Sequence, residues 1–397
     1  MKALKDKNIV LGVTGGIAIY KALDVISKLK KLGANVDVIM TKNATEFVSP
    51  LTFESMSQNK VISDMFKKVV YWDIEHISLA KKADIFTIVP ATANVVGKIA
   101  NGIADDMLTT TVMATNSKVL IAPAMNTNMY NNPIYKLNEE KLKKFGYNFI
   151  KPADGRLACG DKGKGKLASS EEIVKKIKYE LLKTDELEEK KVLVTAGPTI
   201  EKIDPVRYIT NHSSGKMGYE VAKAAKMKGA KVTLITGPTS IKKPDVNIID
   251  VTSADEMYNE AIKYIDYDIV IMAAAVSDYK PKNKFNKKVK KSNDNLTLEL
   301  TRNKDILLEF GKNKQEQILV GFAAESNNLE NYAIKKVDDK NLDFIVANNI
   351  TDKEAGFKSD NNKALIIDKN NGKNYYDLMK KSKLAKIIID KVIQLKE

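Results

Sequence analysis

The chain has 397 residues, of which 44% are hydrophobic and 29% are charged, and its formal net charge at pH 7 is +15. This length exceeds that of an ordinary single domain, so two domains with separate cores are expected. No run approaches the roughly 20 uncharged apolar residues that a membrane helix needs, and the first residues lack a signal-peptide pattern. These features predict a soluble, cytoplasmic protein and exclude a membrane-spanning one.

The ionisable and sulfur-containing residues narrow the choice further. The single cysteine, Cys159, excludes an internal disulfide, and two histidines, His76 and His212, argue against a zinc site of Cys and His ligands. The positive charge could serve a nucleic-acid surface or anionic substrates. A lysine-rich composition is also typical of heat-adapted proteins. This second interpretation is favoured because most lysines here are dispersed along the chain, and the one dense cluster is Lys280–Lys291.

The first half begins with a strand–helix–strand pattern. A β-branched run at Lys7–Val13 is followed by Gly15-Gly16, by apolar residues at helical spacing between Ile19 and Leu29, and by a second strand at Ala34–Thr41. Further buried strands are expected at Ile85–Val89 and Val119–Ala122.

The second half repeats this plan. A strand at Lys191–Ala196, a turn, a helix at Tyr219–Lys228 and a strand at Lys231–Thr236 follow one another. Two such halves predict two doubly wound, Rossmann-like α/β domains, the first of them flavodoxin-like. Later strands are expected at Ile269–Met272, Ile318–Val320 and Phe344–Ala347, and an amphipathic helix at Leu378–Leu395.

The boundary between the halves is expected near residues 185–190. Glu171–Leu182 has the pattern of a helix, and Thr184–Lys190 is a charged stretch that is poor in apolar residues. Such a composition is typical of a linker. We therefore predict domains at residues 1–185 and 190–397, each of which should work when the chain is cut at this stretch.

Glycines and polar loops follow the strands of the first half. Gly15-Gly16 opens a helix, where backbone N–H groups and the helix dipole can bind a phosphate. The GxGxxG spacing is absent, which favours a mononucleotide such as FMN over a dinucleotide. Ligands of such sheets collect at the carboxyl ends of the strands. The expected FMN contacts are Gly15, Gly16, Ile17, Thr41, Pro90, Thr92, Asn94, Asp105 and Thr109.

Six motifs in residues 8–167 resemble the flavin-dependent cysteine decarboxylases, specifically phosphopantothenoylcysteine decarboxylase: TGGIAIYK, EHISLAKKAD, PATAN, NGIADD, PAMNTNMY and ACGDKGKGKL. The resemblance implies that FMN takes two electrons from the cysteine end of the substrate before CO2 leaves. It implies that His76 acts as a base or electrostatic partner and that Asn126 binds the carboxylate or amide. Cys159 would return a proton to the product.

Each of these residues also has a structural interpretation when it is taken alone. Asn126 could brace a turn, Cys159 could be a small buried apolar side chain, and His76 could begin a helix. The glycines from Gly160 to Gly165 predict a mobile loop that suits a lid over substrate. The joint pattern favours catalysis, and the resemblance implies that Asn126 and Cys159 share a pocket while His76 arrives from a neighbouring subunit of a trimer.

The segment Thr195–Gly218 is rich in anion-binding residues. Ser213-Ser214-Gly215 supplies backbone N–H groups and hydroxyls before a helix. Arg207 offers a planar fork to a phosphate or carboxylate. The GxxxxGK[ST] pattern of a P-loop is absent.

Motifs in residues 191–349 resemble phosphopantothenate–cysteine ligase: GPT, DPVRYITNHSSGKMG, AAAVSDY, RNKDIL, GFAAE and NLDFIVANN. The resemblance implies that the carboxylate of 4'-phosphopantothenate attacks the α-phosphate of a nucleoside triphosphate, with CTP favoured over ATP. The amine of cysteine then displaces the nucleotide. Mg²⁺ is expected as the counterion of the triphosphate, with its protein ligands unassigned.

In this half, the resemblance implies residues that bind the negatively charged nucleotide and substrate. Asn211 would bind the acyl-nucleotide and Lys288 the triphosphate, although each lysine alone could be solvated surface charge. Lys304 stands where the family is expected to have proline. The full set of implied nucleotide and substrate contacts is Arg207, Asn211, Ser213, Ser214, Gly215, Met272, Ala273, Ala274, Asp278, Lys288, Lys304, Asp305, Ile306, Leu307, Phe322, Lys336 and Lys340.

The two resemblances together imply a bifunctional enzyme of coenzyme A biosynthesis that ligates and then decarboxylates. It would act on small molecules as a homo-oligomer, in which decarboxylase trimers and ligase dimers could build a dodecamer, with no nucleic-acid or membrane partner. A non-catalytic flavin-fold regulator, a nucleic-acid-binding protein and an electron-transfer flavoprotein are the rival hypotheses. The second predicts aromatic residues among the basic ones, yet Lys280–Lys291 contains only Phe285.

Overall fold

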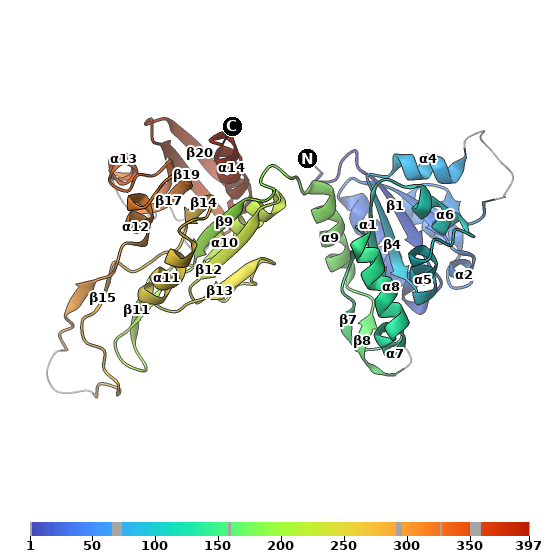
Figure 1. The fold of residues 1–397 in the computed structure, drawn as a ribbon, viewed down its shortest axis with the longest axis horizontal. Coiled ribbons are helices and arrows are strands. Elements are labelled where there is room, and N and C mark those ends of the chain that lie inside the picture. The colour runs from blue at the N-terminus through green and yellow to red at the C-terminus, as the bar shows by residue number, and fades with distance from the viewer. Residues whose placement is uncertain are drawn as a thin grey trace. The chain divides into compact units, whose positions relative to one another are not determined.

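The computed structural model describes residues 2–65, 74–157, 160–290, 296–325, 328–349 and 359–396 (Figure 1). The chain divides into two compact units, Met1–Leu182 and Lys183–Glu397. Each unit is a mainly parallel sheet covered by helices on both faces, which confirms the predicted α/β class. Among the helices of the described ranges, none is both long enough and apolar enough to cross a membrane.

The first unit has a six-stranded sheet in the order β3-β2-β1-β4-β5-β6. All neighbouring strands are parallel, so the strand order reverses between β1 and β4, where ligands of such sheets bind. The strands are β1 (Asn8–Val13), β2 (Asn35–Met40), β3 (Val61–Ile62), β4 (Ile85–Ala91), β5 (Lys118–Pro123) and β6 (Asn148–Phe149).

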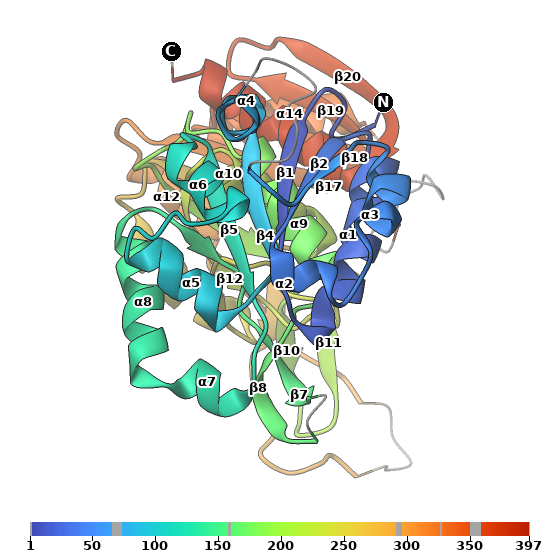
Figure 2. The ribbon, with the colours of Figure 1, turned by 90° about the vertical axis from the view of Figure 1, so that its right-hand side faces the viewer.

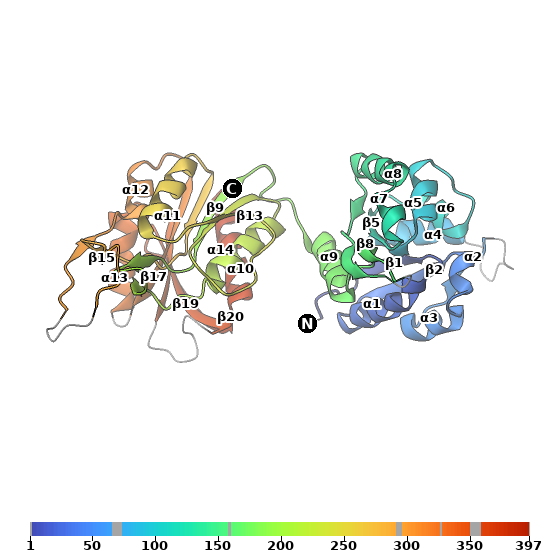
Figure 3. The ribbon, with the colours of Figure 1, turned by 90° about the horizontal axis from the view of Figure 1, so that it is seen from below.

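Helices cover both faces of this sheet, as Figure 3 shows from below. Alternate residues of β1 point to opposite faces: Ile9 and Leu11 pack in one core, and Val10 packs in the other. The first core includes α1 (Tyr20–Lys31), α3 (Pro50–Ser57) and α9 (Ser170–Leu182). The second includes α4 (Glu75–Lys82), α5 (Ala93–Ala100), α6 (Met107–Ala114) and α8 (Pro133–Lys144).

The second unit has an eight-stranded sheet in the order β13-β12-β9-β14-β17-β18-β19-β20. The first six strands are parallel, and the last two add antiparallel to the edge. The strands are β9 (Lys191–Ala196), β12 (Lys231–Thr236), β13 (Asn247–Asp250), β14 (Ile269–Met272), β17 (Ile318–Glu325), β18 (Phe344–Asn349), β19 (Asn361–Asp368) and β20 (Lys373–Lys380).

The helices of the second unit form two layers with separate cores. One core includes α10 (Lys216–Met227) and α14 (Lys381–Gln394). The other includes α11 (Ala254–Ala261), α12 (Ile306–Lys312) and α13 (Leu329–Asp339). The loops that leave the carboxyl ends of β9 and β14 therefore run between two helix layers.

The predicted strands are confirmed, but the C-terminal segment differs from the expectation. Leu378–Lys380 ends β20, and the last helix begins only at Lys381. Lys380 has an extended backbone and pairs with Asn361 of β19. Strand pairing therefore overrides the helical spacing of apolar residues at this point.

The predicted linker, Thr184–Lys190, is packed into the second unit. The Thr184 N–H donates to the Met227 carbonyl oxygen at 2.9 Å, and the Leu187 N–H donates to that of Lys228 at 2.8 Å. The Leu187 side chain is fully buried in the core with α10. The stretch that was predicted to link the domains is therefore ordered and belongs to the second unit, because one apolar residue anchors it.

Replacing Leu187 by alanine should destabilise the second unit by about 2–5 kcal/mol, since a fully buried leucine is truncated and a cavity is left. Hydrogen exchange of the amides in β9 and α10, measured on the full chain, would report the loss. Glu188→Ala, one residue on and exposed, should change the free energy of opening by no more than about 0.5 kcal/mol. Equal exchange in both variants would contradict the anchoring role of Leu187.

Candidate functional sites

Hydrogen bonds join the loops at the carboxyl edge of the first sheet. The Thr14 hydroxyl after β1 donates to the Pro90 carbonyl oxygen at 2.8 Å and accepts from the Thr92 N–H at 3.1 Å. The Thr41 N–H after β2 donates to the Val13 carbonyl oxygen at 3.0 Å. The structure thus brings predicted FMN contacts from the loops after β1, β2 and β4 to one sheet edge.

The turn after β1 provides a place for a phosphate group. The backbone N–H groups of Gly15, Gly16 and Ile17 have no hydrogen-bond acceptor within the described parts of the chain. A Cβ on Gly15 would lie 2.6 Å from Asn43 Cβ, whereas one on Gly16 would meet nothing closer than Thr92 Cγ2 at 3.8 Å. Three unpaired donors before a helix, with open space beside them, fit the phosphate of a mononucleotide such as FMN.

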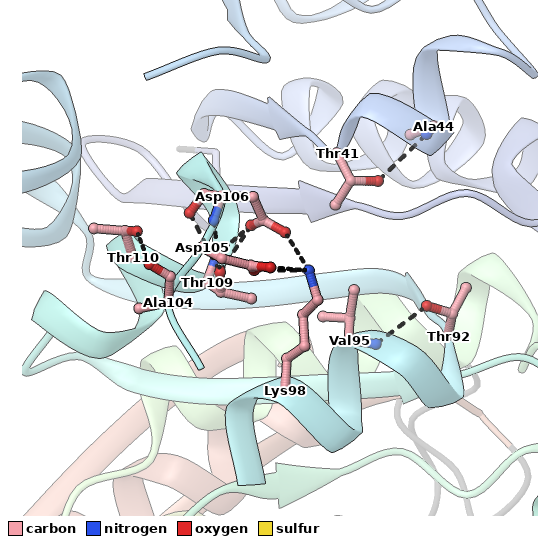
Figure 4. A network of polar contacts seen from close by, with 10 residues as sticks. All are labelled: Thr41, Ala44, Thr92, Val95, Lys98, Ala104, Asp105, Asp106, Thr109 and Thr110. Atoms are coloured by element: carbon pink, nitrogen blue, oxygen red, sulfur yellow. Dashed lines mark hydrogen bonds and ion pairs between the residues drawn. The ribbon is translucent and has the colours of Figure 1, made fainter. Parts of the chain in front are cut away.

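Other predicted FMN contacts belong to a network of helix caps (Figure 4). Lys98 Nζ lies 2.7 Å from a carboxylate oxygen of Asp105, and this ion pair lowers the pKa of Asp105. Thr109 is buried and forms a capping box with Asp106 at the start of α6. Both predicted residues therefore have partners within the protein, while Asn94 is exposed in the first turn of α5.

Asn126 links two elements at the same end of the first unit. Its side-chain oxygen accepts from the Asn128 N–H at 2.8 Å and caps the short helix α7 (Thr127–Asn131). Its side-chain nitrogen donates to an Asp161 carboxylate oxygen at 2.9 Å. Asp161 lies two positions after Cys159, which itself falls outside the described residues. Asn126 is therefore next to the segment that carries the predicted proton donor.

The glycine-rich segment after Cys159 is largely a β-hairpin. Strand β8 (Lys162–Lys166) pairs antiparallel with β7 (Ala153–Arg156), so Gly163 and Gly165, which were predicted to lie in a loop, are in a strand. A Cβ on Gly163 would lie 2.9 Å from Thr127, and one on Gly165 would lie 2.4 Å from the Met125 carbonyl oxygen. These glycines thus allow β8 to pack against the loop that holds Asn126.

His76 lies far from Asn126 within one chain. It is half-buried in the first turn of α4, which leads into the amino end of β4. Figures 1 and 2 show α4 at one end of the unit and α7 with the β7–β8 hairpin at the other. The chain therefore does not bring the predicted base to the predicted substrate-binding amide.

The second unit contains a cavity of about 860 Å³ at the carboxyl ends of its central strands. Most of the predicted nucleotide and substrate residues line it. They are Asn211, Ser213, Ser214, Gly215, Met272, Ala273, Ala274, Asp278, Lys304, Asp305, Ile306, Leu307, Phe322, Lys336 and Lys340.

Two loops of this cavity are tied to each other. The Asn211 side-chain nitrogen donates to the carbonyl oxygens of Ala275 and Val276, at 3.0 and 3.3 Å. The Ala275 N–H donates to the Gly197 carbonyl oxygen at 2.9 Å. The anion-binding turn and the loop after β14 are thus held together as one wall.

Cations gather where α12 and α13 meet the cavity. Lys340 Nζ lies 2.7 Å from an Asp305 carboxylate oxygen, and Asp305 also caps α12 by accepting from the Leu308 N–H at 2.9 Å. Lys304 Nζ lies 4.4 Å from the centre of the Tyr258 ring. With Lys336 beside them, these residues form a positive wall that suits a polyphosphate.

Arg207 and Lys288 do not line this cavity. The Arg207 guanidinium donates to the fully buried carboxylate of Asp204 through Nε at 3.0 Å and also through Nη2, which reaches the Val289 carbonyl oxygen as well. The Arg207 guanidinium holds the pKa of Asp204 well below its usual range. The Arg207 guanidinium, which was predicted to bind a ligand, thus donates to groups of the protein itself. Lys288, next to Val289, is exposed.

Comparisons with known proteins agree on one family. Residues 1–182 match the family model Flavoprotein, and residues 187–395 match the DNA/pantothenate metabolism flavoprotein C-terminal domain. The chain is 49% identical over 397 residues to the coenzyme A biosynthesis bifunctional protein CoaBC of Bacillus subtilis (strain 168), covering 99% of this chain and 98% of that protein. The chain belongs to the family of coenzyme A biosynthesis bifunctional proteins.

Other members and a solved structure are also similar to it. The protein of the same name from Borreliella burgdorferi is 47% identical over 390 residues, which are 97% of this chain and 98% of that protein. The crystal structure of the C-terminal domain of a coenzyme A biosynthesis bifunctional protein CoaBC is 39% identical, covers 53% of this chain and 98% of its own, and gives a TM-score of 0.46.

Several cavity residues of this family member were missed from the sequence. Lys216 adjoins the Ser-Ser-Gly turn and could have been included with it. Asn362 and Lys381 carry no motif and enter the cavity from the C-terminal hairpin and helix, far along the chain. Only the antiparallel addition of β19 and β20 brings them to the edge of the central strands.

Proposed function

We propose that this protein catalyses two consecutive steps of coenzyme A biosynthesis. Its ligase domain, residues 190–397, joins cysteine to 4'-phosphopantothenate at the expense of a nucleoside triphosphate, with CTP preferred. Its decarboxylase domain, residues 1–185, converts the product to 4'-phosphopantetheine with FMN. The observation that carries the proposal is the 860 Å³ cavity, which fifteen of the seventeen residues predicted for the ligase line together.

In the ligation step, the carboxylate of the acid attacks the α-phosphate, pyrophosphate leaves, and the amine of cysteine then displaces the nucleotide. Negative charge concentrates at the phosphates, so Lys304, Lys336 and Lys340 would stabilise it. Asn211 would hold the acyl-nucleotide. The described residues include no cluster of three or more acidic, His or Cys side chains that could cage a metal, so the proposed Mg²⁺ would be held mainly by the phosphates themselves.

In the decarboxylation step, bound FMN supplies a two-electron acceptor. The N–H groups of Gly15, Gly16 and Ile17 would bind its phosphate, and Thr41 and Thr92 would flank it. Asn126 would orient the substrate carboxylate next to the segment of Cys159, the proposed proton donor. His76 would reach this site from a neighbouring copy, because its own chain places it at the other end of the unit; this supports a homo-oligomer, proposed as trimers of decarboxylase units.

The rival function is that of a non-catalytic flavin-fold regulator, and solution measurements separate the two. An absorbance spectrum of the purified protein should show bound flavin, and incubation with 4'-phosphopantothenate and CTP or ATP should release pyrophosphate, faster with CTP. A colourless protein that cannot bind FMN would remove the decarboxylase proposal. Failure to release pyrophosphate with either nucleotide would remove the ligase proposal.

The proposal extends to assembly and location. Dimers of ligase units joined to trimers of decarboxylase units would give a dodecamer, which sedimentation or mass photometry would detect. One cysteine in 397 residues suits the reducing conditions of the cytoplasm.

A further inference from the structure

A chain of contacts joins the turn after β1 to the start of α6 in the first unit. The Thr14 hydroxyl accepts from the N–H of Thr92, which caps α5. From the same helix, the Lys98 side chain extends to the carboxylates of Asp105 and Asp106, as Figure 4 shows. Asp106 caps α6. This group of three charges therefore lies beside loops that carry predicted FMN contacts.

Lys98 is the one cation that pairs with these two carboxylates in the part of the chain that the structure describes. Its Nζ lies 2.7 and 2.9 Å from the carboxylate oxygens of Asp105 and 3.4 Å from one of Asp106. The lysine side chain is 22% exposed and that of Asp105 is 56% exposed. The Asp105 carboxylate thus remains accessible to a ligand, while most of the lysine side chain is covered.

The Lys98–Asp105 pair is charged at neutral pH. The hydrogen bond to Asp105 raises the pKa of Lys98, and the same bond lowers the pKa of Asp105. One ammonium group and two carboxylates together leave a single negative charge at the start of α6. Without the ammonium group, two neighbouring carboxylates would remain there with no cation to offset them.

The loop between α5 and α6 does not need this ammonium group to keep its shape. The Ile103 N–H donates to the Lys98 carbonyl oxygen at 2.9 Å, and Asp106 and Thr109 form the capping box of α6. Ion pairs that are partly exposed add little to stability. The contribution of the Lys98 side chain is therefore chiefly its positive charge.

The surroundings of the charged group suit the ring of a flavin. Ile17 and Ile103, from the loops after β1 and α5, are large apolar side chains that remain exposed. A flavin ring has two apolar faces and one polar edge. The apolar side chains fit the faces, and Lys98 with Asp105 fits the polar edge. Two-electron reduction adds negative charge to that edge, so carboxylates without a counterion beside it would oppose reduction.

We propose that Lys98 is a positioning residue of the flavin site, which fixes the Asp105 carboxylate and offsets the charge of Asp105 and Asp106 beside bound FMN, and so raises the reduction potential of the flavin. The inference rests on the proposed decarboxylase function and adds the residue that tunes its electron acceptor. A higher potential favours the transfer of two electrons from the cysteine end of the substrate.

The test compares Lys98→Met with the wild-type full chain. The Kd of oxidised FMN, from fluorescence titration, should change little, because the N–H groups that bind the phosphate remain. The Kd of reduced FMN should rise about 10-fold relative to that of oxidised FMN, since a unit positive charge is lost beside the ring. For a two-electron couple, this ratio lowers the reduction potential by about 30 mV, which equilibration with a reference dye measures.

The opposite change of charge separates this electrostatic role from a structural one. Asp105→Asn removes a negative charge and should raise the potential by about 30 mV. The double variant, Lys98→Met with Asp105→Asn, restores the net charge and should return to the wild-type potential. A merely structural ion pair predicts instead that both single variants weaken FMN binding and that the double variant recovers nothing. Asp105→Asn carries the test if Lys98→Met does not fold.

Two further variants are the controls. Lys98→Arg keeps the charge and should keep the wild-type potential. Lys7 pairs with Asp84 at 3.4 Å, directly before β1 and β4, at the opposite edge of the same sheet. Lys7→Met should therefore leave both the potential and the Kd of FMN unchanged.

The outcomes distinguish this inference from the proposed function. Equal potentials in the wild type, Lys98→Met and Asp105→Asn, with FMN bound in all three, would overturn the role of Lys98 and leave the decarboxylase proposal intact. A fall of the potential in Lys98→Arg as large as in Lys98→Met would also overturn it. A wild-type protein that binds no FMN would instead overturn the proposed function.

Discussion

Replacing Gly165 by alanine should lower decarboxylation by about 100-fold and leave ligation intact. The Gly165 carbonyl oxygen accepts from the Met125 N–H at 3.0 Å, and an added Cβ would lie 2.4 Å from the Met125 carbonyl oxygen. Its φ of +137° also disfavours any residue with a side chain. The loop that holds Asn126 must then move, and a displacement of about 1 Å at a reacting group can cost 100-fold in rate.

The measurement is CO2 release from 4'-phospho-N-pantothenoylcysteine, with pyrophosphate release recorded on the same sample. Gly97→Ala is the matched control, because its Cβ would meet only the Asn138 side-chain nitrogen at 3.7 Å, an ordinary contact. Flavin absorbance should be equal in both variants. Normal decarboxylation in Gly165→Ala would show that the packing of β8 against the Asn126 loop does not position the substrate.

The reciprocal change, Gly237→Ala, should lower ligation by about 100-fold and spare decarboxylation. A Cβ on Gly237 would lie 1.7 Å from the Pro198 carbonyl oxygen, so the segment around Pro198 must shift. That segment supports a wall of the cavity: the Gly197 carbonyl oxygen accepts from the Ala275 N–H, and the Thr199 hydroxyl accepts from the Ser277 N–H at 3.0 Å. Misplaced walls misalign the acid and the α-phosphate.

Pyrophosphate release with saturating and limiting nucleotide would show the loss of ligation in Gly237→Ala. Ser240→Ala, at an exposed position three residues further along the chain, should behave as the wild type. If Gly237→Ala also lost decarboxylation, the two units would not be independent in folding. If it kept full ligation, the close approach of Gly237 to Pro198 would have no bearing on the cavity.

Most of the central strands could be predicted from the sequence because they are buried on both faces. Such strands appear as continuous apolar runs, as in Ile269–Met272, which matches β14 residue for residue. The edge strand β20 was missed because most of its residues are exposed or half-buried and polar. The burial of Leu187 could not be predicted, since a single buried residue in a charged stretch leaves no periodic pattern.

The candidate sites were predictable where a motif directly follows a parallel strand. The carboxyl ends of such strands meet at one edge, so Ala273, Ala274 and Phe322 line one cavity although they are distant in sequence. Tertiary partners were not predictable in the same way. The ion pair between Arg207 and Asp204 could have been expected, because the two residues are three positions apart. The positions of Asn362 and Lys381 in the cavity could not, because they depend on the pairing of β19 with β20.

The packing of Thr184–Lys190 shortens the covalent connection between the two units to almost nothing. Helix α9 of the first unit ends at Leu182, and the Thr184 N–H already donates a hydrogen bond to the Met227 carbonyl oxygen of the second unit. Only Lys183 therefore lies between the two units along the chain. Two Cα steps span roughly 8 Å at most. Within one chain, such a tether cannot act as a swinging arm that carries an intermediate from ligation to decarboxylation. The intermediate of the proposed pathway would pass by diffusion, at a rate set by its local concentration within the proposed oligomer.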